Sequence, residues 1–423
     1  MSMDAWIAAA IFVVAYVLIA IDRWDRTLVA LLGALLVILT GILDQHEAFA
    51  AIDLNVIFLL AGMMVLANVI AKTGFFELVA IRSVRLSHGE PVRLLLILAA
   101  VTAVLSAFLD NVTTVVLIAP ITISVARRLD ISPVPYLLAC VFASNIGGTA
   151  TLIGDPPNIL IGSAAGLDFG AFLFNLAPVI VIVFAVFAGI MWLTFRGQLK
   201  VPDERKEFVL ERAEVTAIKD RPLLIRSLIV AGITIVAFVV HGPLGLEPAT
   251  IALLGATVLM LIARLEPREA LQEVEWSTLF FFVGLFILVQ SIVATGIVRG
   301  FADALAEATQ GNVAVATIAL LWFSAGASAV VDNIPYTATA IPVVQRLVVG
   351  GMDNNALWWA LSLGACLGGN LTIIGASANV VVANMSDRAG YRISFAYFFK
   401  YGVAVFLSSI AISTVYLWVR YLA

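Results

Sequence analysis

The chain has 423 residues, of which 62% are hydrophobic and only 12% are charged, and its mean hydropathy is +1.08. Soluble domains are closer to half apolar and a quarter charged, so this composition excludes a soluble globular protein and predicts one embedded in a bilayer. The formal net charge of −4 indicates no particular partner. Cys140 and Cys366 each lie alone in an apolar segment, so they predict neither a disulfide framework nor a metal-ligand motif.

Apolar segments of about the length needed to cross a bilayer recur along the whole chain. A transmembrane helix needs about 20 apolar residues, and ten segments reach or approach this length. In chain order the predicted spans are residues 3–21, 27–43, 54–72, 134–163, 171–195, 225–241, 248–263, 276–297, 356–386 and 397–420.

Two further apolar stretches, residues 92–128 and 312–348, are too long for one span and too short for two. Each has a polar centre, SAFLDNVTT at 106–114 and SAVVDNIPYTA at 328–338. Irregular backbone at membrane depth is tolerated only where protein or water surrounds it. We therefore predict two re-entrant helical hairpins that enter and leave the membrane on the same face.

The positive charges predict the side of the membrane on which each loop lies, because cytoplasmic loops carry an excess of Lys and Arg. If the loop at 196–226 is cytoplasmic, only Arg299, Arg346 and Arg420 of the 24 Lys and Arg residues lie outside. This orientation predicts a multi-pass protein of the cytoplasmic membrane with both termini outside. The charged residues 200–222 then form a solvated cytoplasmic linker.

The two halves of the chain repeat one unit. DLNVIFLLAGMMVLANVIAKTG (53–74) resembles EWSTLFFFVGLFILVQSIVATG (275–296), FLDN matches VVDN, and GGTATLIGDPPN matches GGNLTIIGASAN. Each copy holds five spans and one hairpin. Because five is odd, the second copy is inverted relative to the first. Inverted repeats with broken helices are typical of secondary transporters.

We therefore predict an all-α polytopic membrane protein. It consists of two inverted repeats of five transmembrane spans, each with a re-entrant helical hairpin and a broken helix. The predicted organisation is a first repeat at 1–199 with hairpin 92–128 and broken helix 134–163, a cytoplasmic linker at 200–222, and a second repeat at 223–423 with hairpin 312–348 and broken helix 356–386.

Glycine and proline interrupt the apolar pattern in GGTATLIGDPP, residues 147–157. Bare backbone in hydrocarbon costs several kcal/mol per group, so such a break survives only where it lines a cavity or lies inside protein. The freed N–H and C=O groups are then ligands for ions. The predicted break residues are Gly147, Gly148, Gly154, Pro156, Pro157, Gly368, Gly369 and Gly375.

Three acidic residues lie within the predicted membrane region, Asp110 and Asp332 at the hairpin tips and Asp155 at the first break. An intramembrane acid costs at least about 2.5–3.5 kcal/mol and usually faces a transport pathway. Each either binds a proton or Na⁺ during transport, or caps a helix by accepting backbone N–H bonds. Symmetry favours coupling for Asp110 and Asp332. For Asp155 the two roles are equally open, because its counterpart is Ala376.

Amide and hydroxyl side chains recur at the same places. Their oxygens can bind a cation and their donors can bind an anion, while a local role in turns is the alternative. The further predicted site residues are Asn111, Thr113, Thr149, Thr151, Asn158, Asn333, Asn370, Thr372, Ser377 and Asn379, with Asn111 and Asn333 joining Asp110 and Asp332 as candidate Na⁺ ligands.

Five stretches in order resemble one known group: SAFLDNVTTVVLIAPIT, NIGGTATLIGDPPNILI, VEWSTLFFFVGLF, DNIPYTATAIPVV and GACLGGNLTIIGASANVV. They resemble the ArsB/NhaD branch of the ion transporter superfamily, which includes the melanosomal P protein and is related to the citrate and divalent anion symporters. The resemblance covers nearly the whole chain. It implies a homodimer built from a scaffold part and a moving part, with elevator-like alternating access.

The resulting prediction is an ion-coupled carrier that moves a small anion or arsenite, driven by protons. The alternatives are a Na⁺/H⁺ antiporter of the NhaD kind, a sodium-coupled anion or dicarboxylate symporter, and an anion channel. We expect no enzyme activity and no cofactor beyond the coupling ion, H⁺ or Na⁺. The expected partners are the bilayer, the solute and a second copy. A soluble ATPase partner is left open, and no nucleic acid is expected.

Overall fold

The computed structural model describes residues 2–21, 23–199, 201, 218–352 and 355–423, and the secondary structure of these residues is entirely helical. The first half contains α1 (Met3–Ile21), α2 (Arg26–Leu39), α3 (Gln45–Ala50), α4 (Leu54–Lys72), α5 (Phe75–Ser87), α6 (Pro91–Ser106), α7 (Asn111–Arg128), α8 (Val134–Gly148), α9 (Pro156–Ala165), α10 (Phe169–Asn175) and α11 (Ala177–Phe195). The second half contains α13 (Arg221–Val240), the 3-10 turn η1 (Gly242–Leu244), α14 (Pro248–Ala263), α15 (Pro267–Gln272), α16 (Trp276–Ala294), α17 (Ile297–Ala308), α18 (Val313–Ser328), α19 (Asn333–Val349), α20 (Ala356–Gly368), α21 (Ser377–Arg388), α22 (Phe395–Leu417) and the π-helical turn η2 (Trp418–Leu422). The predicted all-α class is confirmed.

Aspartate side chains cap the N-termini of several of these apolar helices. Asp25 accepts hydrogen bonds from the N–H groups of Thr27 and Leu28 at the start of α2, and Asp53 accepts one from Val56 at the start of α4. The first N–H groups of a helix have no partner inside the helix, and a carboxylate also complements the positive end of the helix dipole. Capping is therefore a recurrent use of aspartate in this chain.

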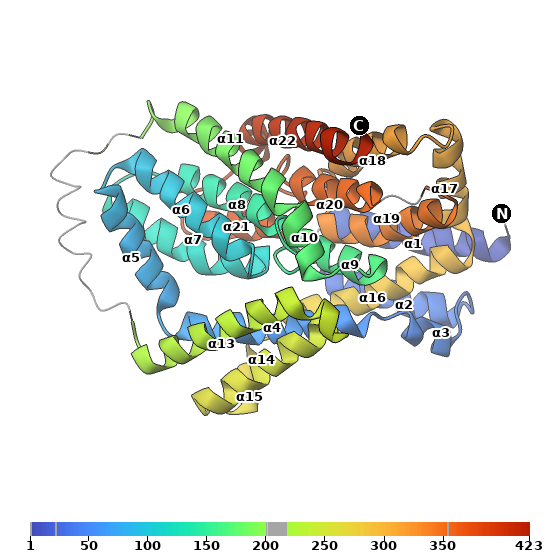
Figure 1. Ribbon diagram of the computed structural model, residues 1–423, viewed down its shortest axis with the longest axis horizontal. Coiled ribbons are helices and arrows are strands. Elements are labelled where there is room, and N and C mark those ends of the chain that lie inside the picture. Colours follow the sequence, from blue (N-terminus) through green and yellow to red (C-terminus); the bar gives the residue numbers. More distant parts are fainter. Residues whose placement is uncertain (1, 22, 200, 202–217, 353–354) are drawn as a thin grey trace.

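Apart from α10, the helices of the first half recur in the same order in α13 to α22, at an offset of 221–222 residues. FVVAYV in α1 (12–17) matches TIVAFV in α13 (234–239). The packing repeats as well, because α6 lies on α8 and α18 lies on α20. In Figure 1 α5 and α6 lie at one end of the long axis and α17 lies at the opposite end, as expected for two inverted copies.

Helices from both repeats pack together in a scaffold of α1, α2, α4, α13, α14 and α16. Its close contacts depend on small residues. A Cβ atom on Gly62 of α4 would lie 2.7 Å from the Ala252 backbone of α14, and one on Gly284 of α16 would lie 2.6 Å from the Ala30 backbone of α2. Small residues let helix backbones approach within a membrane, where dispersion contacts replace the hydrophobic effect.

Six helices in the described part of the chain are long and apolar enough to cross a membrane: α1, α4, α11, α13, α16, and α22 together with η2. The bent pair α9–α10, at 116°, raises this number to seven. The chain is therefore a multi-pass membrane protein. The number of spans recognised by length is lower than the ten expected, because α2 and α14 are short and the segments 134–163 and 356–386 each divide into two helices.

Five short helices were not anticipated from the apolar pattern, namely α3, α5, α10, α15 and α17. The chain turns into α5 and α17 at Gly74 and Gly296, which have φ angles of 84° and 77°. Glycine adopts this left-handed conformation without steric cost. In the linker predicted at 200–222, residue 200 and residues 202–217 lie outside the described residues, and α13 already begins at Arg221.

Candidate functional site

The two hairpins and the two broken helices meet where the repeats join. The first hairpin, α6–α7, turns at residues 107–110, and the second hairpin, α18–α19, turns at 329–332. The second arm of each hairpin packs on the broken helix of the other repeat, α7 on α21 and α19 on α9. Four helices, α7, α9, α19 and α21, therefore begin near one another in a region shared by both repeats.

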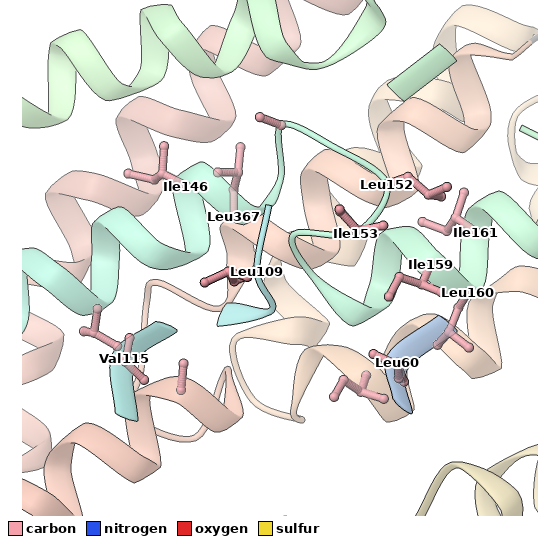
Figure 2. Close-up of a cluster of buried hydrophobic side chains, with 14 of the residues drawn as sticks. Leu60, Leu109, Val115, Ile146, Leu152, Ile153, Ile159, Leu160, Ile161 and Leu367 are labelled. Carbon is pink, nitrogen blue, oxygen red and sulfur yellow. The ribbon is translucent and has the colours of Figure 1, made fainter. Parts of the chain in front are cut away.

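The first broken helix opens into a loop between α8 and α9, as Figure 2 shows. Its apolar side chains are buried, with Leu152 and Ile153 each 2% exposed. Leu152 packs so closely on α9 that a Cβ atom on Gly162 would lie 2.2 Å from its Cδ1 atom. The loop is thus anchored on α9 by apolar packing.

Each hairpin tip is hydrogen-bonded to the broken helix of its own repeat by equivalent residues. In the first repeat Ser106 donates to the carbonyl of Ser144 at 2.8 Å, and Thr151 donates to the carbonyl of Ala107. In the second repeat Ser328 donates to the Ala365 carbonyl at 2.5 Å and Thr372 to the Ala329 carbonyl at 2.6 Å. The predicted site residues Thr151 and Thr372 therefore fasten the tips.

The glycines of the two breaks allow backbones to touch. A Cβ atom on Gly147 would lie 2.1 Å from the Ala103 carbonyl oxygen, and one on Gly368 would lie 2.5 Å from the Ala325 carbonyl oxygen. The other predicted glycines come together as two pairs within the loops. The pairs are Gly148 with Gly154 and Gly369 with Gly375. In each pair a Cβ atom on one glycine would meet the carbonyl oxygen of the other.

Asp155 lies between the two hairpins and is fully buried. Asn111 of the first hairpin donates from Nδ2 to its Oδ1 atom at 3.2 Å. Asn333 of the second hairpin donates from Nδ2 to its Oδ1 and Oδ2 atoms at 3.2 and 3.3 Å. One carboxylate thus contacts both repeats, although its counterpart Ala376 has no polar side chain.

Asn145 of α8, also fully buried, connects the same groups. Its Oδ1 atom accepts from Asn111 at 3.3 Å, and its Nδ2 atom donates to Asn370 Oδ1 at 2.9 Å and to Asn379 Oδ1 at 3.0 Å. Asn145 is not among the residues predicted for the site. An asparagine near the end of a largely apolar helix was the available signal, but its counterpart is Cys366 and symmetry gave it no support.

Asn158 and Asn379 hold the two loops in shape. Asn158 donates to the carbonyls of Thr149 and Thr151 at 3.1 and 2.8 Å. Asn379 donates to the carbonyls of Gly369 and Thr372 at 2.7 and 2.8 Å. These amides donate to carbonyl groups that lose their helical partners at the break. This is the local structural role given above as the alternative to ion binding.

The amide oxygen of Asn158 accepts hydrogen bonds from α20 of the other repeat, from Ser362 Oγ at 2.6 Å and Cys366 Sγ at 3.5 Å. Thr149 bonds back to the carbonyl of Asn145 within its helix at 2.7 Å. Pro156 and Pro157 occupy the first two positions of α9, where their missing N–H groups leave no unpaired donor.

The hairpin-tip acids cap the helices that follow them. Asp110 accepts from the N–H groups of Val112 and Thr113 at 2.9 and 3.0 Å and from the Thr113 hydroxyl. Asp332 accepts from the N–H group of Ile334 at 3.1 Å. The two residues, equivalent in sequence, therefore share the capping role. A coupling role for either remains a prediction.

Three buried polar atoms of the described residues near these contacts have no hydrogen-bond partner: Asn370 Nδ2, Thr114 Oγ1 and Thr337 Oγ1. Thr114 follows Asn111 by one turn of α7, and Thr337 follows Asn333 by one turn of α19. Residues three or four apart lie on the same helix face. The two hydroxyls therefore line the same faces as the amides that contact Asp155.

This fold, with broken helices and a polar centre inside an apolar bundle, is typical of a membrane transporter. A family model described as "Citrate transporter", CitMHS, matches residues 16–364. The chain therefore belongs to the CitMHS family. The expectation of a transporter and not an enzyme is confirmed by this family and by the names of the relatives.

Relatives match over nearly the whole chain. The "46 kDa membrane protein" of Mycobacterium leprae is 46% identical over 423 residues, covering 98% of this chain and 99% of that protein. The human P protein is 33% identical over 500 residues, covering 98% of this chain and 60% of that protein. The crystal structure of the Alcanivorax borkumensis YdaH transporter covers 99% of this chain and 98% of its own with a TM-score of 0.58 at 15% identity, which shows a shared fold.

Proposed function

We propose that the protein is a proton-coupled secondary carrier for a small anion, with Asp155 as its coupling group. The observation that supports this most directly is the position of Asp155, which is fully buried and bonded to one asparagine of each hairpin. A buried carboxylate is costly unless it is neutralised, so binding and release of a proton or cation at this point are favourable steps.

Protonation of Asp155 changes the contacts that join the repeats. The ionised carboxylate only accepts hydrogen bonds, and Asn333 Nδ2 lies within 3.3 Å of both its oxygens. A proton on either oxygen converts an acceptor into a donor, which faces an amide N–H group. Asn333 then keeps its hydrogen bond to the other oxygen only, and this weakened contact links proton binding to movement of the second hairpin.

The cargo we propose is a small anion, with arsenite as one candidate, carried by an elevator-type movement in the ArsB or P-protein manner. The four helices that begin near Asp155 support an anion, because helix N-termini favour negative charge. The family description as a citrate transporter is consistent with an anionic cargo. We place the carrier, as a homodimer, in the cytoplasmic membrane with both termini outside. Asp110 and Asp332 support the site by capping α7 and α19.

A second candidate is Na⁺ in place of the proton, either as an antiporter or as a symporter with the anion. The unpartnered hydroxyls of Thr114 and Thr337 support it. With the Asp155 carboxylate and the amide oxygens of Asn111 and Asn333, they supply oxygen ligands, which hard cations prefer.

The test uses purified protein in proteoliposomes that contain a pH-sensitive dye. Na⁺, citrate, phosphate, chloride and arsenite are added in turn to wild type, Asp155→Asn and the exposed control Asp4→Asn. We expect one anion to move protons with wild type and the control, and no proton movement with Asp155→Asn. Proton movement driven by Na⁺ alone supports the second candidate. Anion transport that ignores the pH gradient, or proton coupling retained in Asp155→Asn, contradicts the proposal.

A further inference from the structure

The second hairpin is fastened to the scaffold by polar contacts from α1. The Tyr16 hydroxyl donates to the carbonyl of Pro335 on α19 at 3.0 Å and shares a hydrogen bond with Thr339 Oγ1 at 2.7 Å. The ring of Tyr16 stacks on Phe12 of the same helix, with centroids 4.0 Å apart, so its position is fixed by its own helix.

Arg26, the first residue of α2, adds a charged contact to the tip of the same hairpin. Its Nη1 atom lies 3.3 Å from Asp332 Oδ2 and 2.5 Å from Ser377 Oγ. Ser377 in turn donates to Asp332 Oδ2 at 2.5 Å. The Arg26 and Asp332 side chains are only 32% and 12% exposed, so water and salt screen this pair less than a surface pair.

The first hairpin cannot form the same contacts with the other side of the scaffold. The 222-residue offset aligns α1–α2 with α13–α14, and each polar residue of the contact except Asp332, which matches Asp110, has an apolar counterpart. The pairs are Tyr16 with Phe238, Arg26 with Pro248 and Thr339 with Leu117 at offset 222, and Ser377 with Pro156 at offset 221. None of these counterparts has a side chain that can hydrogen-bond.

A cavity borders the scaffold on the side of the first hairpin. It has a volume of about 160 Å³ and separates α13 from the first hairpin. Its lining includes Ala231, Thr234 and Ile235 of α13, and Leu105, Phe108 and Leu109 near the tip of the hairpin. The scaffold is therefore in polar contact with the second hairpin and only loosely packed against the first.

We propose that Tyr16 and Arg26, with Asp332, Thr339 and Ser377, form a polar lock that favours the conformation seen here over its mirror image. The inference rests on the proposed function, because a carrier built of inverted repeats alternates between two such conformations. In the mirrored conformation the first hairpin approaches α13–α14 and the second leaves α1–α2. The lock then breaks, and Phe238 and Pro248 cannot replace it.

Hydrogen–deuterium exchange of the full-length protein in lipid nanodiscs tests the lock without any substrate. The variants are Arg26→Gln and Tyr16→Phe, and Arg23→Gln is the control for loss of an exposed positive charge near α2. We expect both lock variants to increase exchange at the tip of the second hairpin, residues 329–335, and to decrease it at the first tip, residues 107–113. The ratio of the two conformations should change roughly tenfold, which corresponds to 1.4 kcal/mol.

The reciprocal change separates a shift between conformations from simple loosening. Increased exchange at both tips indicates general destabilisation and overturns the proposal, as does unchanged exchange in both variants. Tyr16→Phe removes a single hydroxyl, so it keeps the test decisive if Arg26→Gln does not fold. The exchange experiment uses neither substrate nor a pH gradient. Its result therefore does not depend on whether Asp155 couples protons to transport.

Building the mirrored contact provides a gain-of-function test. The double variant Phe238→Tyr with Leu117→Thr places on α13 and α7 the two hydroxyls that Tyr16 and Thr339 supply in the lock. We expect it to decrease exchange at residues 107–113 and increase it at 329–335. Increased exchange at 107–113 would contradict the inference.

Discussion

Replacing Gly147 with alanine is predicted to push the first hairpin away from the first broken helix. The new Cβ atom would lie 2.1 Å from the carbonyl oxygen and 2.5 Å from the Cα atom of Ala103. Since Cβ contacts below 3.4 Å are uncommon, α6 must retreat by about 1.3 Å, the difference between 3.4 and 2.1 Å. The obstacle is backbone and cannot rotate away.

Overpacking of this kind costs about 1–3 kcal/mol, and a backbone obstacle places the cost at the upper end of that range. Alanine in a helix regains roughly 0.5–1 kcal/mol relative to glycine. The net expectation is a loss of roughly 2 kcal/mol in the free energy of unfolding. Gly368→Ala should cost less, because its Cβ atom would lie 2.5 Å from the Ala325 carbonyl oxygen and needs a retreat of about 0.9 Å to reach 3.4 Å.

Thermal unfolding of the purified protein in detergent, followed by the loss of the monodisperse peak in size-exclusion chromatography, measures this order. Gly326→Ala on α18 is the matched control, because its Cβ atom would meet nothing within 4 Å. We expect Gly147→Ala to melt at the lowest temperature, Gly368→Ala at an intermediate one, and Gly326→Ala at or above wild type. A Gly147→Ala variant as stable as wild type would refute the close packing of α6 on α8.

Two more predictions concern the polar contacts. Asn145→Ala should lower the melting temperature, because it removes the donor to Asn370 and Asn379 and leaves buried acceptors unpaired at about 1–3 kcal/mol each; an unchanged melting curve would show that these amides rearrange among themselves. Thr372→Val should release the second hairpin tip by removing the bond to the Ala329 carbonyl, which increased hydrogen exchange at residues 329–335 would report, whereas exchange equal to wild type would contradict it.

The repeat was predictable from sequence because equivalent residues make equivalent contacts in the two halves. The paired glycines bring backbones together, and Asn158 and Asn379 hold the two loops alike. Asp110 and Asp332 form a symmetric pair, and this symmetry favours them as coupling residues. In the structure both cap helices, a role that the local sequence also predicts.

The centre of the site was harder to predict because its key contacts are asymmetric. Asp155 aligns with Ala376 and Asn145 aligns with Cys366 when the repeats are compared. The repeat therefore does not indicate that either residue belongs to the site. Their partners lie on other helices, and only the packing of α19 on α9 brings Asn333 to Asp155. Arg26 lies just before the predicted span 27–43, and nothing local indicates that it reaches Asp332, 306 positions away.

The central claim is that Asp155 is the carboxyl group that exchanges a proton during transport. Infrared difference spectroscopy of the reconstituted protein, recorded between neutral and alkaline buffer so that exposed carboxyl groups stay ionised, detects the band of a protonated carboxyl without knowledge of the substrate. We predict a pH-dependent band that is present in wild type, Asp110→Asn and Asp332→Asn and absent in Asp155→Asn. A band that persists in Asp155→Asn, or one that disappears only in a hairpin-tip variant, would contradict the assignment.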